Sequence, residues 1–184
     1  ALAIFLTDRG PIFYGHKRVG FDGRPFRCWK LRSMVTNGDE VLSKYLEENP
    51  QHLQVWQTER KLDDDPRVTR IGAILRKTSL DELPQVFNVL MGDMSLVGPR
   101  PVVVAELDHY ASSKVHYLRA RPGVTGLWQV SGRSDTTYKQ RVNLDRYYVT
   151  NWQLKRDMWI LFMTVRSARR RRRRRSSGSR MSSR

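Results

Sequence analysis

Two adjacent carboxylates, Asp81 and Glu82, are the side chains in this sequence best suited to chemistry. Several cations lie close to them along the chain, among them Arg76, Lys77 and Arg100. A carboxylate pair at a helix N-terminus among fixed cations can hold a divalent metal against phosphate oxygens. An aspartate can also attack a phosphorus centre once the charge of the substrate is neutralised. The pattern therefore favours a site for a phosphorylated substrate.

The same pair of acids has a purely structural interpretation, which is helix capping. With Asp81 as the N-cap, Pro84 falls at the third helical position, where its missing N–H costs little. With Ser79 as the N-cap, Ser79 and Glu82 form a capping box, but Pro84 then interrupts the backbone hydrogen bonds of the helix. An isolated Asp-Glu pair is more often structural than catalytic, so the functional interpretation depends on the surrounding cations.

Cations in two parts of the sequence are candidates for binding phosphate. Arg100 is flanked by Pro99 and Pro101, which restrict the local backbone and make the position of the guanidinium reproducible. A planar guanidinium matches a phosphate through two parallel hydrogen bonds. Lys30 and Arg32 alternate with apolar residues and therefore share one face of an expected strand. The structural alternatives are an ordinary surface turn for Arg100 and a solvated strand face for Lys30.

The composition indicates an anionic partner but does not identify which kind. The chain of 184 residues has a formal net charge of +16, and nine arginines in residues 169–184 supply +9 of it. The rest of the chain, at +7, is still basic, which indicates a phosphorylated substrate, lipid headgroups or nucleic acid. A single cysteine, Cys28, excludes an intrachain disulfide. No apolar run reaches the about 18 residues of a membrane-spanning helix, although the apolar opening, residues 1–6, resembles the end of a longer hydrophobic segment.

The elements that must position these residues are mostly helical. Residues 12–19 and 26–31 are predicted to form a β-hairpin around an Asp-Gly turn. The helical pattern over 37–62 is expected to split at Asn49-Pro50. Further helices are expected over 68–76, 106–118, 138–148 and 157–165, with an apolar run over 86–90 and a glycine-containing loop over 121–133. We therefore predict a compact, helix-rich α+β domain with a small N-terminal β-hairpin packed on helices.

A series of motifs follows in unbroken order along residues 7–165. They are Gly-Pro-Ile-Phe-Tyr (10–14), Arg-Val-Gly (18–20), Lys-Leu-Arg-Ser-Met (30–34), Arg-Lys-Thr-Ser-Leu-Asp-Glu-Leu-Pro-Gln (76–85), Asn-Val (88–89), Gly-Asp-Met-Ser-Leu-Val-Gly-Pro-Arg-Pro (92–101) and Arg-Pro-Gly-Val-Thr-Gly-Leu-Trp-Gln-Val-Ser-Gly-Arg (121–133). This series resembles the bacterial sugar transferases, the monotopic phosphoglycosyl transferases that begin exopolysaccharide, capsule and glycan assembly. The acidic insert between Met34 and Asp65 is most similar to the galactose-phosphate transferase branch of exopolysaccharide systems.

The resemblance implies a two-step transfer of a sugar 1-phosphate. Asp81 would attack the β-phosphate of a UDP-sugar, release UMP and carry the sugar phosphate as an aspartyl adduct. A polyprenyl phosphate such as undecaprenyl phosphate would then accept it as a polyprenyl diphosphate sugar. Glu82, together with Asp81, would coordinate Mg²⁺, which offsets the diphosphate charge that repels a carboxylate.

The resemblance also assigns roles to the cations of the chain. Lys30 and Arg100 would hold phosphate oxygens, and Arg76 and Arg133 are further candidates for the same role. Asp93 is a weaker candidate for the same site. These assignments agree with the interpretation drawn from the residues themselves, in which a carboxylate pair works among fixed cations.

The cytoplasmic face of the bacterial inner membrane is the expected location, since UDP-sugars are available there and the lipid phosphate lies at the interface. Residues 1–168 would form the transferase domain, with the N-terminal membrane helix of the family missing or truncated. Residues 169–184 would form a disordered Arg/Ser-rich tail that is either simply solvated or attracted to anionic lipid. The apolar side chains of residues 152–162 either lie at the interface or pack in the core. Glycosyltransferases that extend the product are candidate downstream partners.

Two other classes of function remain as alternatives. A nucleic-acid-binding module would explain the basic charge, but no recognised binding motif or aromatic-studded sheet is evident, so no specific nucleic-acid partner is expected. A scaffold that has lost its activity is disfavoured because both carboxylates and the flanking cations are present.

Overall fold

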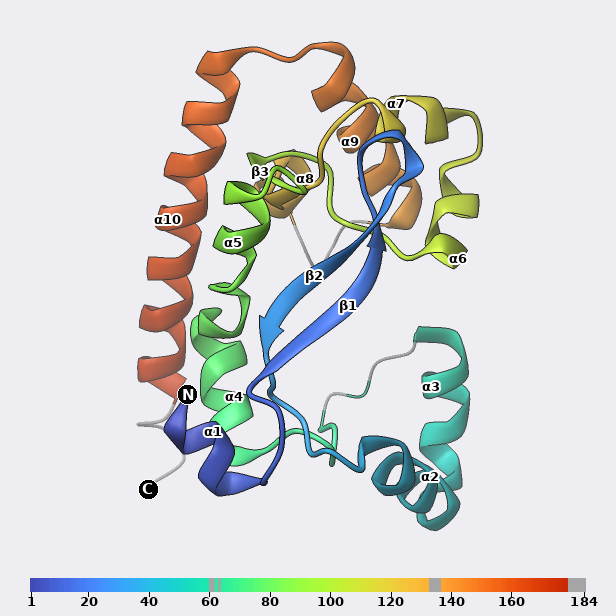
Figure 1. Ribbon diagram of the computed structural model, residues 1–184, viewed down its shortest axis with the longest axis vertical. Helices are drawn as coiled ribbons and strands as arrows, with labels where there is room; N and C mark the ends of the chain where they lie inside the picture. Colours follow the sequence, from blue (N-terminus) through green and yellow to red (C-terminus); the bar gives the residue numbers. More distant parts are fainter. Residues whose placement is uncertain (60–61, 63, 133–136, 179–184) are drawn as a thin grey trace. The chain divides into compact units, whose positions relative to one another are not determined.

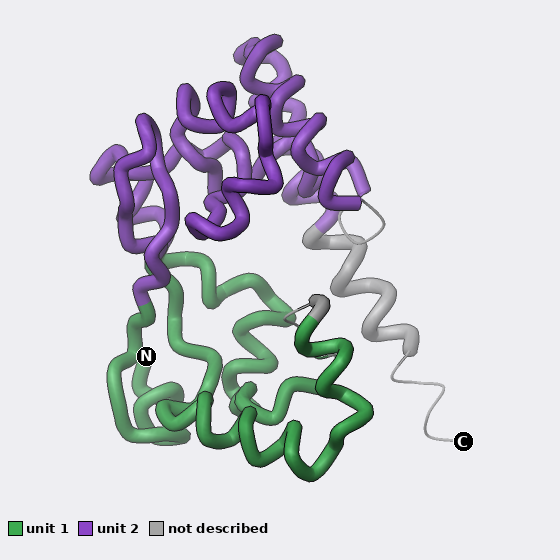
Figure 2. Tube along the Cα trace, turned by 90° about the vertical axis from the view of Figure 1, so that its right-hand side faces the viewer, with its two compact units in different colours: residues 1–14, 29–84 green, residues 15–28, 85–184 purple. Residues whose placement is uncertain are grey.

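In the computed structural model, the described residues are 1–59, 62, 64–132 and 137–178. The chain forms two compact units, which Figure 2 distinguishes by colour. Unit 1 comprises Ala1–Tyr14 and Trp29–Pro84, and unit 2 comprises Gly15–Cys28 and Gln85–Arg184. Helices predominate and the sheets are small, which confirms the predicted helix-rich α+β class.

The predicted hairpin is confirmed, with β1 (Phe13–Val19) and β2 (Pro25–Leu31) joined by the 3-10 turn η1 (Phe21–Gly23) (Figure 1). Asp22 and Gly23 have φ of 56° and 76°, the left-handed region that an Asp-Gly pair adopts readily. The tip of the hairpin packs on α7 (Lys114–Leu118), where the Tyr117 hydroxyl donates a 2.8 Å hydrogen bond to the Val19 carbonyl. The tip of the hairpin and α7 are therefore held together within unit 2.

Within unit 1, α4 (Arg70–Thr78) packs on α1 (Leu2–Thr7) and contacts Ser33, which follows β2. Thr69 caps α4 by accepting a 2.9 Å hydrogen bond from the Gly72 N–H. A Cβ at Gly72 would lie 1.9 Å from the Ser33 carbonyl oxygen, so only glycine allows this close approach. The packing fixes the start of α4 against the segment that follows β2.

The acidic insert of unit 1 forms two helices, as its pattern predicted. α2 (Gly38–Glu48) and α3 (Leu53–Glu59) are separated by the 3-10 turn η2 (Pro50–His52), because Pro50 cannot continue the first helix. The Tyr45 hydroxyl and His52 Nδ1 are 2.6 Å apart and hold the two helices at this turn.

Unit 2 is built around two short parallel strands that are far apart in the sequence. β3 (Ser95–Val97) pairs with β4 (Gly123–Thr125), with Ser95 opposite Gly123 and Val97 opposite Thr125. The remaining helices of this unit are α5 (Gln85–Leu90), α6 (Val104–Leu107), α8 (Leu127–Val130), α9 (Tyr138–Thr150) and α10 (Leu154–Gly178), with the 3-10 segment η4 (Asp108–Ser113) between α6 and α7.

Two apolar clusters fill the core of unit 2. One consists of Val19, Val102, Leu107, Tyr110, Tyr117 and Val142. The other consists of Val97, Leu127, Tyr148 and Ile160. Val97 of β3 belongs to the second cluster, and Val102 belongs to the first. The segment that contains Arg100 is therefore anchored by core packing both before and after this residue.

Two sequence predictions for unit 2 are corrected. The helix expected over 106–118 is interrupted by η4, where Ala111 has φ 43° and ψ −125°. The break turns the ring of Tyr110 into the core, and this tertiary packing overrides local helix propensity. The loop expected over 121–133 contains β4 and α8, because residues 123–125 find a partner strand that a local pattern cannot reveal.

The C-terminal helix is longer than its apolar pattern predicted. α10 continues to Gly178, into the segment expected to be disordered from Arg169 onward. Arginine is a good helix former, so a helix begun by the apolar residues can continue into the basic run. The domain boundary at residue 168 stays a prediction.

Candidate active site

Asp81 and Glu82 lie in the 3-10 turn η3 (Leu80–Glu82), directly after α4. Ser79, between the two elements, has φ 58° and ψ 20° and ends α4 in the left-handed conformation. An N-cap residue needs an extended backbone for its side chain to reach the following N–H groups, and Ser79 accordingly makes no side-chain cap. Asp81 lies inside the turn rather than at its start. Neither capping arrangement considered for this pair is therefore found.

The Lys30 ammonium forms an ion pair with Glu82, with 2.8 Å between Nζ and Oε1. The side chains of Lys30 and Glu82 are 35% and 40% exposed, so solvent reaches both. Lys30 comes from β2 and Glu82 from η3, and the fold of unit 1 brings them together from distant parts of the sequence. The predicted phosphate-binding lysine thus neutralises the second acid of the pair.

Asp81, in contrast to its neighbour, is only 8% exposed. Burial raises the pKa of its carboxyl above the ordinary value, and the positive charge of Lys30 partly offsets this shift. The negative charge of Glu82 raises the pKa of Asp81 further, whereas the charge of Arg76 lowers it. A partly desolvated carboxylate beside fixed cations is a stronger nucleophile than one in water, provided that it is ionised.

Arg76, in the last turn of α4, is held by a residue that follows β2. Its Nε donates a 2.8 Å hydrogen bond to the Ser33 hydroxyl. Within unit 1, the structure therefore brings together four of the predicted site residues: Asp81, Glu82, Lys30 and Arg76.

Arg100 belongs to unit 2, in the segment between β3 and α6. Its guanidinium carbon lies 5.8 Å from the centre of the Trp128 ring, within the range of a cation–π contact. Among the ion pairs of the described residues, none includes the Arg100 guanidinium. Arg133, the other predicted phosphate ligand from this half of the sequence, lies outside the described residues.

Asp93, the weaker candidate, has a structural contact in unit 2. Its carboxylate accepts a 3.2 Å hydrogen bond from the Asn88 side chain, and its backbone N–H donates to the Asn88 carbonyl. These bonds close the turn that follows α5, which gives Asp93 a role in local structure.

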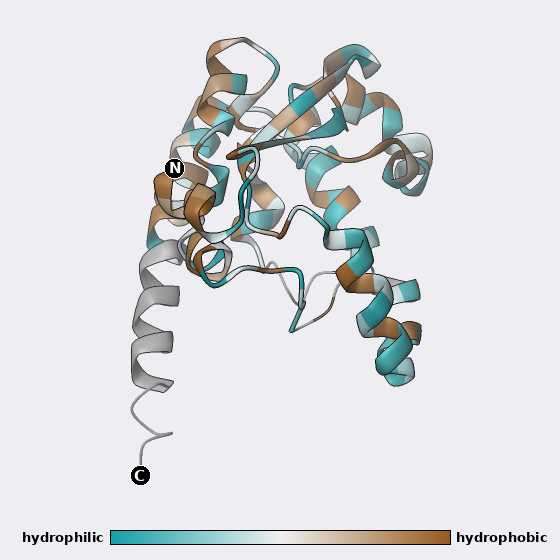
Figure 3. Ribbon diagram, turned by 60° about the horizontal axis from the view of Figure 1, so that its bottom comes forward, coloured by the Kyte–Doolittle hydropathy of each residue, from teal (hydrophilic) through white to brown (hydrophobic). Residues whose placement is uncertain are grey.

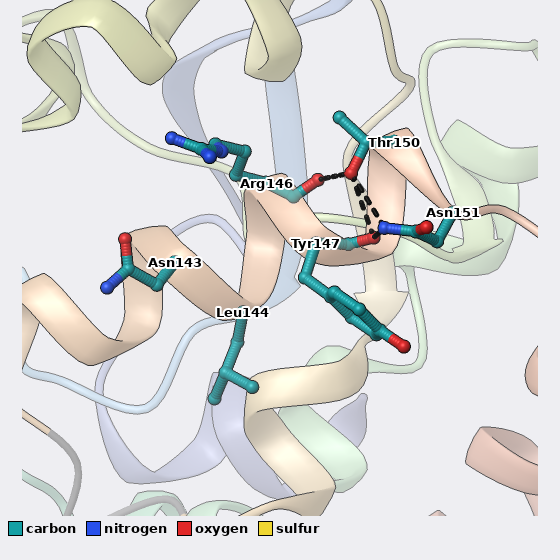
Figure 4. A pocket seen from close by; sticks show the side chains of 6 residues that line it. All are labelled: Asn143, Leu144, Arg146, Tyr147, Thr150 and Asn151. Atoms are coloured by element: carbon teal, nitrogen blue, oxygen red, sulfur yellow. Dashed lines mark hydrogen bonds between the residues drawn. The ribbon is translucent and has the colours of Figure 1, made fainter.

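A hollow of about 550 Å³ lies on α9, lined by Asn143, Leu144, Arg146, Tyr147, Thr150 and Asn151 (Figure 4). The Thr150 hydroxyl donates to the Arg146 carbonyl, and the Asn151 amide donates to the Tyr147 carbonyl. These side chains thus form hydrogen bonds with backbone carbonyl groups in the last turn of α9 itself. The lining holds neither an acid nor any predicted site residue, so this hollow is not a candidate for the catalytic site.

The acid pair fits a magnesium ion by its chemistry. Mg²⁺ usually takes one or two protein carboxylates and fills its remaining positions with water and substrate phosphate oxygens. Asp81 and Glu82 supply two such carboxylates, and the described part of the chain holds no cluster of three or more acids, histidines or cysteines suited to a fully protein-bound metal. Glu82, the more exposed of the two, would be the main ligand.

Sequence reasoning gave no role to Asp145 of α9. Its carboxylate is 2% exposed and accepts a 2.8 Å hydrogen bond from the Tyr110 hydroxyl. Burial raises the pKa of Asp145 to about 7, although the charges of Arg141 and Arg100 oppose this shift. In the sequence, Asp145 looks like one more polar residue of an amphipathic helix, and only the tertiary structure distinguishes it.

Comparison with known proteins identifies the family. The profile described as "Bacterial sugar transferase" matches residues 1–171. The "Exopolysaccharide production protein ExoY" of Sinorhizobium fredii is 55% identical over 159 residues, which are 86% of this chain and 70% of that protein. The "UDP-galactose-lipid carrier transferase" of Erwinia amylovora is 55% identical over 166 residues, covering 89% of this chain and 35% of that protein.

A third relative is the "Undecaprenyl-phosphate galactose phosphotransferase" of Salmonella typhimurium, 55% identical over 86% of this chain and 33% of that protein. This chain thus spans about a third of the length of the two relatives named for galactose. The match favours an enzyme over a nucleic-acid-binding module, and it extends over the segments that supply Lys30, the Asp81–Glu82 pair and Arg100. The chain belongs to the bacterial sugar transferase family.

Proposed function

We propose that this protein transfers a sugar 1-phosphate from a UDP-sugar to a polyprenyl phosphate through a covalent intermediate on Asp81. The observation that carries the proposal is the buried Asp81 carboxylate beside the Lys30–Glu82 ion pair and Arg76. Family membership supports the class of reaction, and the names of the relatives support a lipid carrier as acceptor.

In the first step, a carboxylate oxygen of Asp81 forms a bond to the β-phosphorus of the UDP-sugar. The bond from that phosphorus to the oxygen bridging the two phosphates breaks, and UMP leaves with this oxygen and its electron pair. In the second step, a phosphate oxygen of the polyprenyl phosphate attacks the same phosphorus and displaces the Asp81 carboxylate. The product is a polyprenyl diphosphate sugar, and the enzyme regains its free carboxylate.

The cations of unit 1 favour the first step electrostatically. Lys30 and Arg76 stabilise the ionised form of Asp81, which is the form that attacks. They also offset the negative charge of an incoming diphosphate. In this proposal Arg100 and Arg133 hold phosphate oxygens, because a guanidinium matches two of them at once.

Magnesium would be held by Glu82, with Asp81 as a second ligand. When bound, the ion neutralises diphosphate charge and so allows a carboxylate to approach the phosphorus. The ion pair with Lys30 holds Glu82 at 2.8 Å in a defined position before any ligand binds. Lys30 therefore orients the proposed metal ligand as well as contributing charge.

We propose the cytoplasmic face of the inner membrane as the site of action. Among the described residues, no helix is long and apolar enough to cross a membrane. α1 is largely apolar (Figure 3), and α10 carries an exposed apolar stripe on one face. The stripe consists of Leu154, Met158, Phe162 and Val165.

The opposite face of α10 packs in the core of unit 2 through Ile160, which is fully buried. One face of this segment therefore packs in the core, and the other face is exposed. The exposed stripe has the spacing of an amphipathic helix that lies in a membrane interface, with Lys155 and Arg156 beside it. We propose that it contacts lipid, which would place the protein near its lipid acceptor. Enzymes that extend the product stay predicted partners.

The test uses the full-length protein with polyprenyl phosphate and, separately, UDP-galactose, UDP-glucose and UDP-N-acetylglucosamine. UDP-galactose is the first choice because two relatives are named for galactose. The proposal predicts UMP and a lipid diphosphate sugar as products. Release of UDP would contradict it, because UDP is the product when the sugar alone is transferred.

A further inference from the structure

Two guanidinium groups lie against one tryptophan ring in unit 2. The guanidinium carbon of Arg141, from α9, lies 4.5 Å from the centre of the Trp128 ring, and that of Arg100 lies 5.8 Å from it. Both distances are within the range of a cation–π contact. The guanidinium carbon of Arg141 also lies 4.8 Å from the centre of the Tyr138 ring. The aromatic rings therefore hold two positive charges near each other.

A third arginine, Arg18 of β1, joins this group from the hairpin. Its Nη1 donates to the carbonyl of Pro101, the residue after Arg100, at 3.3 Å. The same nitrogen lies 3.6 Å from a carboxylate oxygen of Glu106, and the Glu106 carbonyl accepts a 3.2 Å hydrogen bond from the Tyr138 hydroxyl. These contacts close a circle of side chains, which we call the arginine cluster. It consists of Arg18, Arg100, Glu106, Trp128, Tyr138 and Arg141.

The arginine cluster carries more positive than negative charge, since its three guanidinium groups are accompanied by the one carboxylate of Glu106. Burial lowers the pKa of Arg18, the charge of Glu106 opposes this shift, and the charge of Arg100 lowers the pKa further. Burial raises the pKa of Asp145, in the same unit, to about 7, so this acid carries only part of a negative charge at neutral pH. Like charges held this close repel one another, and a bound anion would relieve the repulsion.

Two N–H groups of the arginine cluster are buried without an acceptor. Trp128 is 8% exposed, and neither its Nε1 nor Nε of Arg141 has a hydrogen-bond partner among the described residues. A buried donor without an acceptor costs free energy, so each would gain from an oxygen that a ligand brings. Nε and one Nη of an arginine lie along the same edge of the guanidinium and can donate to two oxygens of one phosphate. Both the charge and the donors of the cluster thus point to a phosphate ligand.

We propose that the arginine cluster binds a phosphate monoester through the guanidinium groups of Arg141 and Arg100, with Trp128 holding both groups in place. A phosphate monoester carries nearly two negative charges at neutral pH, which matches the excess positive charge of the cluster. The inference rests on the proposed function and deepens it, because it names Arg141 as a further phosphate-binding residue. Two phosphate monoesters take part in the proposed reaction, the UMP that leaves and the polyprenyl phosphate that accepts the sugar phosphate.

The first test measures the Kd of the full-length protein for UMP and, separately, for farnesyl phosphate by calorimetry, with uridine and farnesol as controls that lack the phosphate. Arg141→Gln should raise the Kd of one or both monoesters by about 10- to 100-fold, the effect of losing a charge-assisted hydrogen bond. Arg141→Lys keeps the charge but not the planar pair of donors, so its Kd should lie between those of the parent and Arg141→Gln. The monoester that loses affinity identifies the ligand as the leaving nucleotide or the lipid acceptor.

Arg146→Gln is the matched control. Arg146 lies on the same helix, α9, but lines the hollow shown in Figure 4 and is not part of the arginine cluster. Its substitution removes the same charge and should change either Kd by less than about two-fold, because an exposed charge outside the site contributes little. Equal losses in Arg146→Gln and Arg141→Gln would mean that the basic chain attracts phosphate without a site. That result, or an unchanged Kd for both monoesters in Arg141→Gln, would overturn the inference.

The second test observes Trp128 in the parent protein by NMR, so it does not depend on the folding of an arginine variant. The indole N–H signal of Trp128 is identified as the one that Trp128→Phe removes. It should shift when the bound monoester is added, because a charged acceptor arrives beside it, and should stay in place with uridine or farnesol. The indole N–H of Trp152, which already donates to Asp157 at 3.0 Å, is the internal control and should not shift. An unshifted Trp128 signal at a saturating concentration of both monoesters would overturn the inference.

Neither test requires turnover, so failure of the inference and failure of the proposed function are distinguishable. If monoester binding depends on Arg141 but no adduct forms on Asp81, the phosphate site is supported and the covalent mechanism is wrong. If the adduct forms on Asp81 while monoester binding is independent of Arg141, the mechanism is supported and the site in the arginine cluster is overturned.

Discussion

Nζ of Lys30 lies 2.8 Å from Oε1 of Glu82, so the cation of β2 is paired with the acid next to the proposed nucleophile. The charges of Lys30 and Glu82 act on the pKa of Asp81 in opposite directions, Lys30 lowering it and Glu82 raising it. The ionisation of Asp81 therefore depends on both members of the ion pair. Removing Lys30 should raise the pKa of Asp81, and removing the charge of Glu82 should lower it.

Lys30→Ala should move the acid limb of the pH–kcat/KM profile to higher pH, and Glu82→Gln should move it to lower pH. Asp81 must be ionised to attack, so the rate falls as pH drops through its pKa. Neither substitution should lower the free energy of unfolding by more than about 1 kcal/mol, because the pair is partly exposed. Shifts in the same direction, or no shift, would mean that Asp81 does not control the acid limb.

Asp81→Asn should raise the melting temperature of the protein at pH 7–8. The folded pKa of Asp81 lies above its unfolded value, so the ionised carboxylate destabilises the folded state at pH above the folded pKa. This cost disappears as pH falls through the folded pKa to about 4, the ordinary value for aspartate. The stabilisation by Asp81→Asn should therefore vanish in acid. Asp64→Asn, at an exposed acid of the same unit, is the control for the loss of a carboxylate.

Turnover should require a divalent cation. Without one, the charge of a diphosphate repels the Asp81 and Glu82 carboxylates. Excess chelator should abolish UMP release, and Mg²⁺ added in excess of the chelator should restore it. Glu82→Gln should raise the Mg²⁺ concentration needed for half-maximal rate. Undiminished turnover in chelator would refute the metal role assigned to this acid pair.

Phe162→Glu should weaken binding of the full-length protein to vesicles that contain anionic lipid. Phe162 is 63% exposed on the apolar stripe of α10, so the substitution places a charge on the face proposed to meet lipid while leaving the core untouched. Gln57→Glu makes the same change of charge on the exposed surface of α3 and serves as the control. Vesicle sedimentation gives the readout, and equal binding by both variants would exclude the stripe as a lipid contact.

Local sequence patterns were sufficient for the elements that carry the proposed site of unit 1. The Asp-Gly turn specified the hairpin that presents Lys30, and Asn49-Pro50 specified the division of the insert. The adjacency of Asp81 and Glu82 to Arg76 in the sequence already indicated a charged site. The 2.8 Å pairing of Glu82 with Lys30 could not be predicted, since it joins residues 52 apart.

Features that depend on tertiary partners were beyond local reasoning. The strand at residues 123–125 exists because β3 lies beside it, and Gly98 and Gly123 permit that approach. The helix expected over 106–118 is broken at Ala111, where Tyr110 turns toward Asp145. A polar residue on a helix gives no sign in the sequence that it is buried, so Asp145 could be found only in the folded structure.

The central claim, that Asp81 carries the sugar phosphate, is tested most directly by trapping the intermediate. The full-length protein is incubated with UDP-galactose and Mg²⁺ but without polyprenyl phosphate, quenched, digested and analysed by peptide mass spectrometry. We predict a hexose phosphate on Asp81 and one equivalent of UMP per adduct. Asp81→Asn should abolish both, and Asp64→Asn should retain them. An adduct on Glu82, or any adduct in Asp81→Asn, would contradict the mechanism.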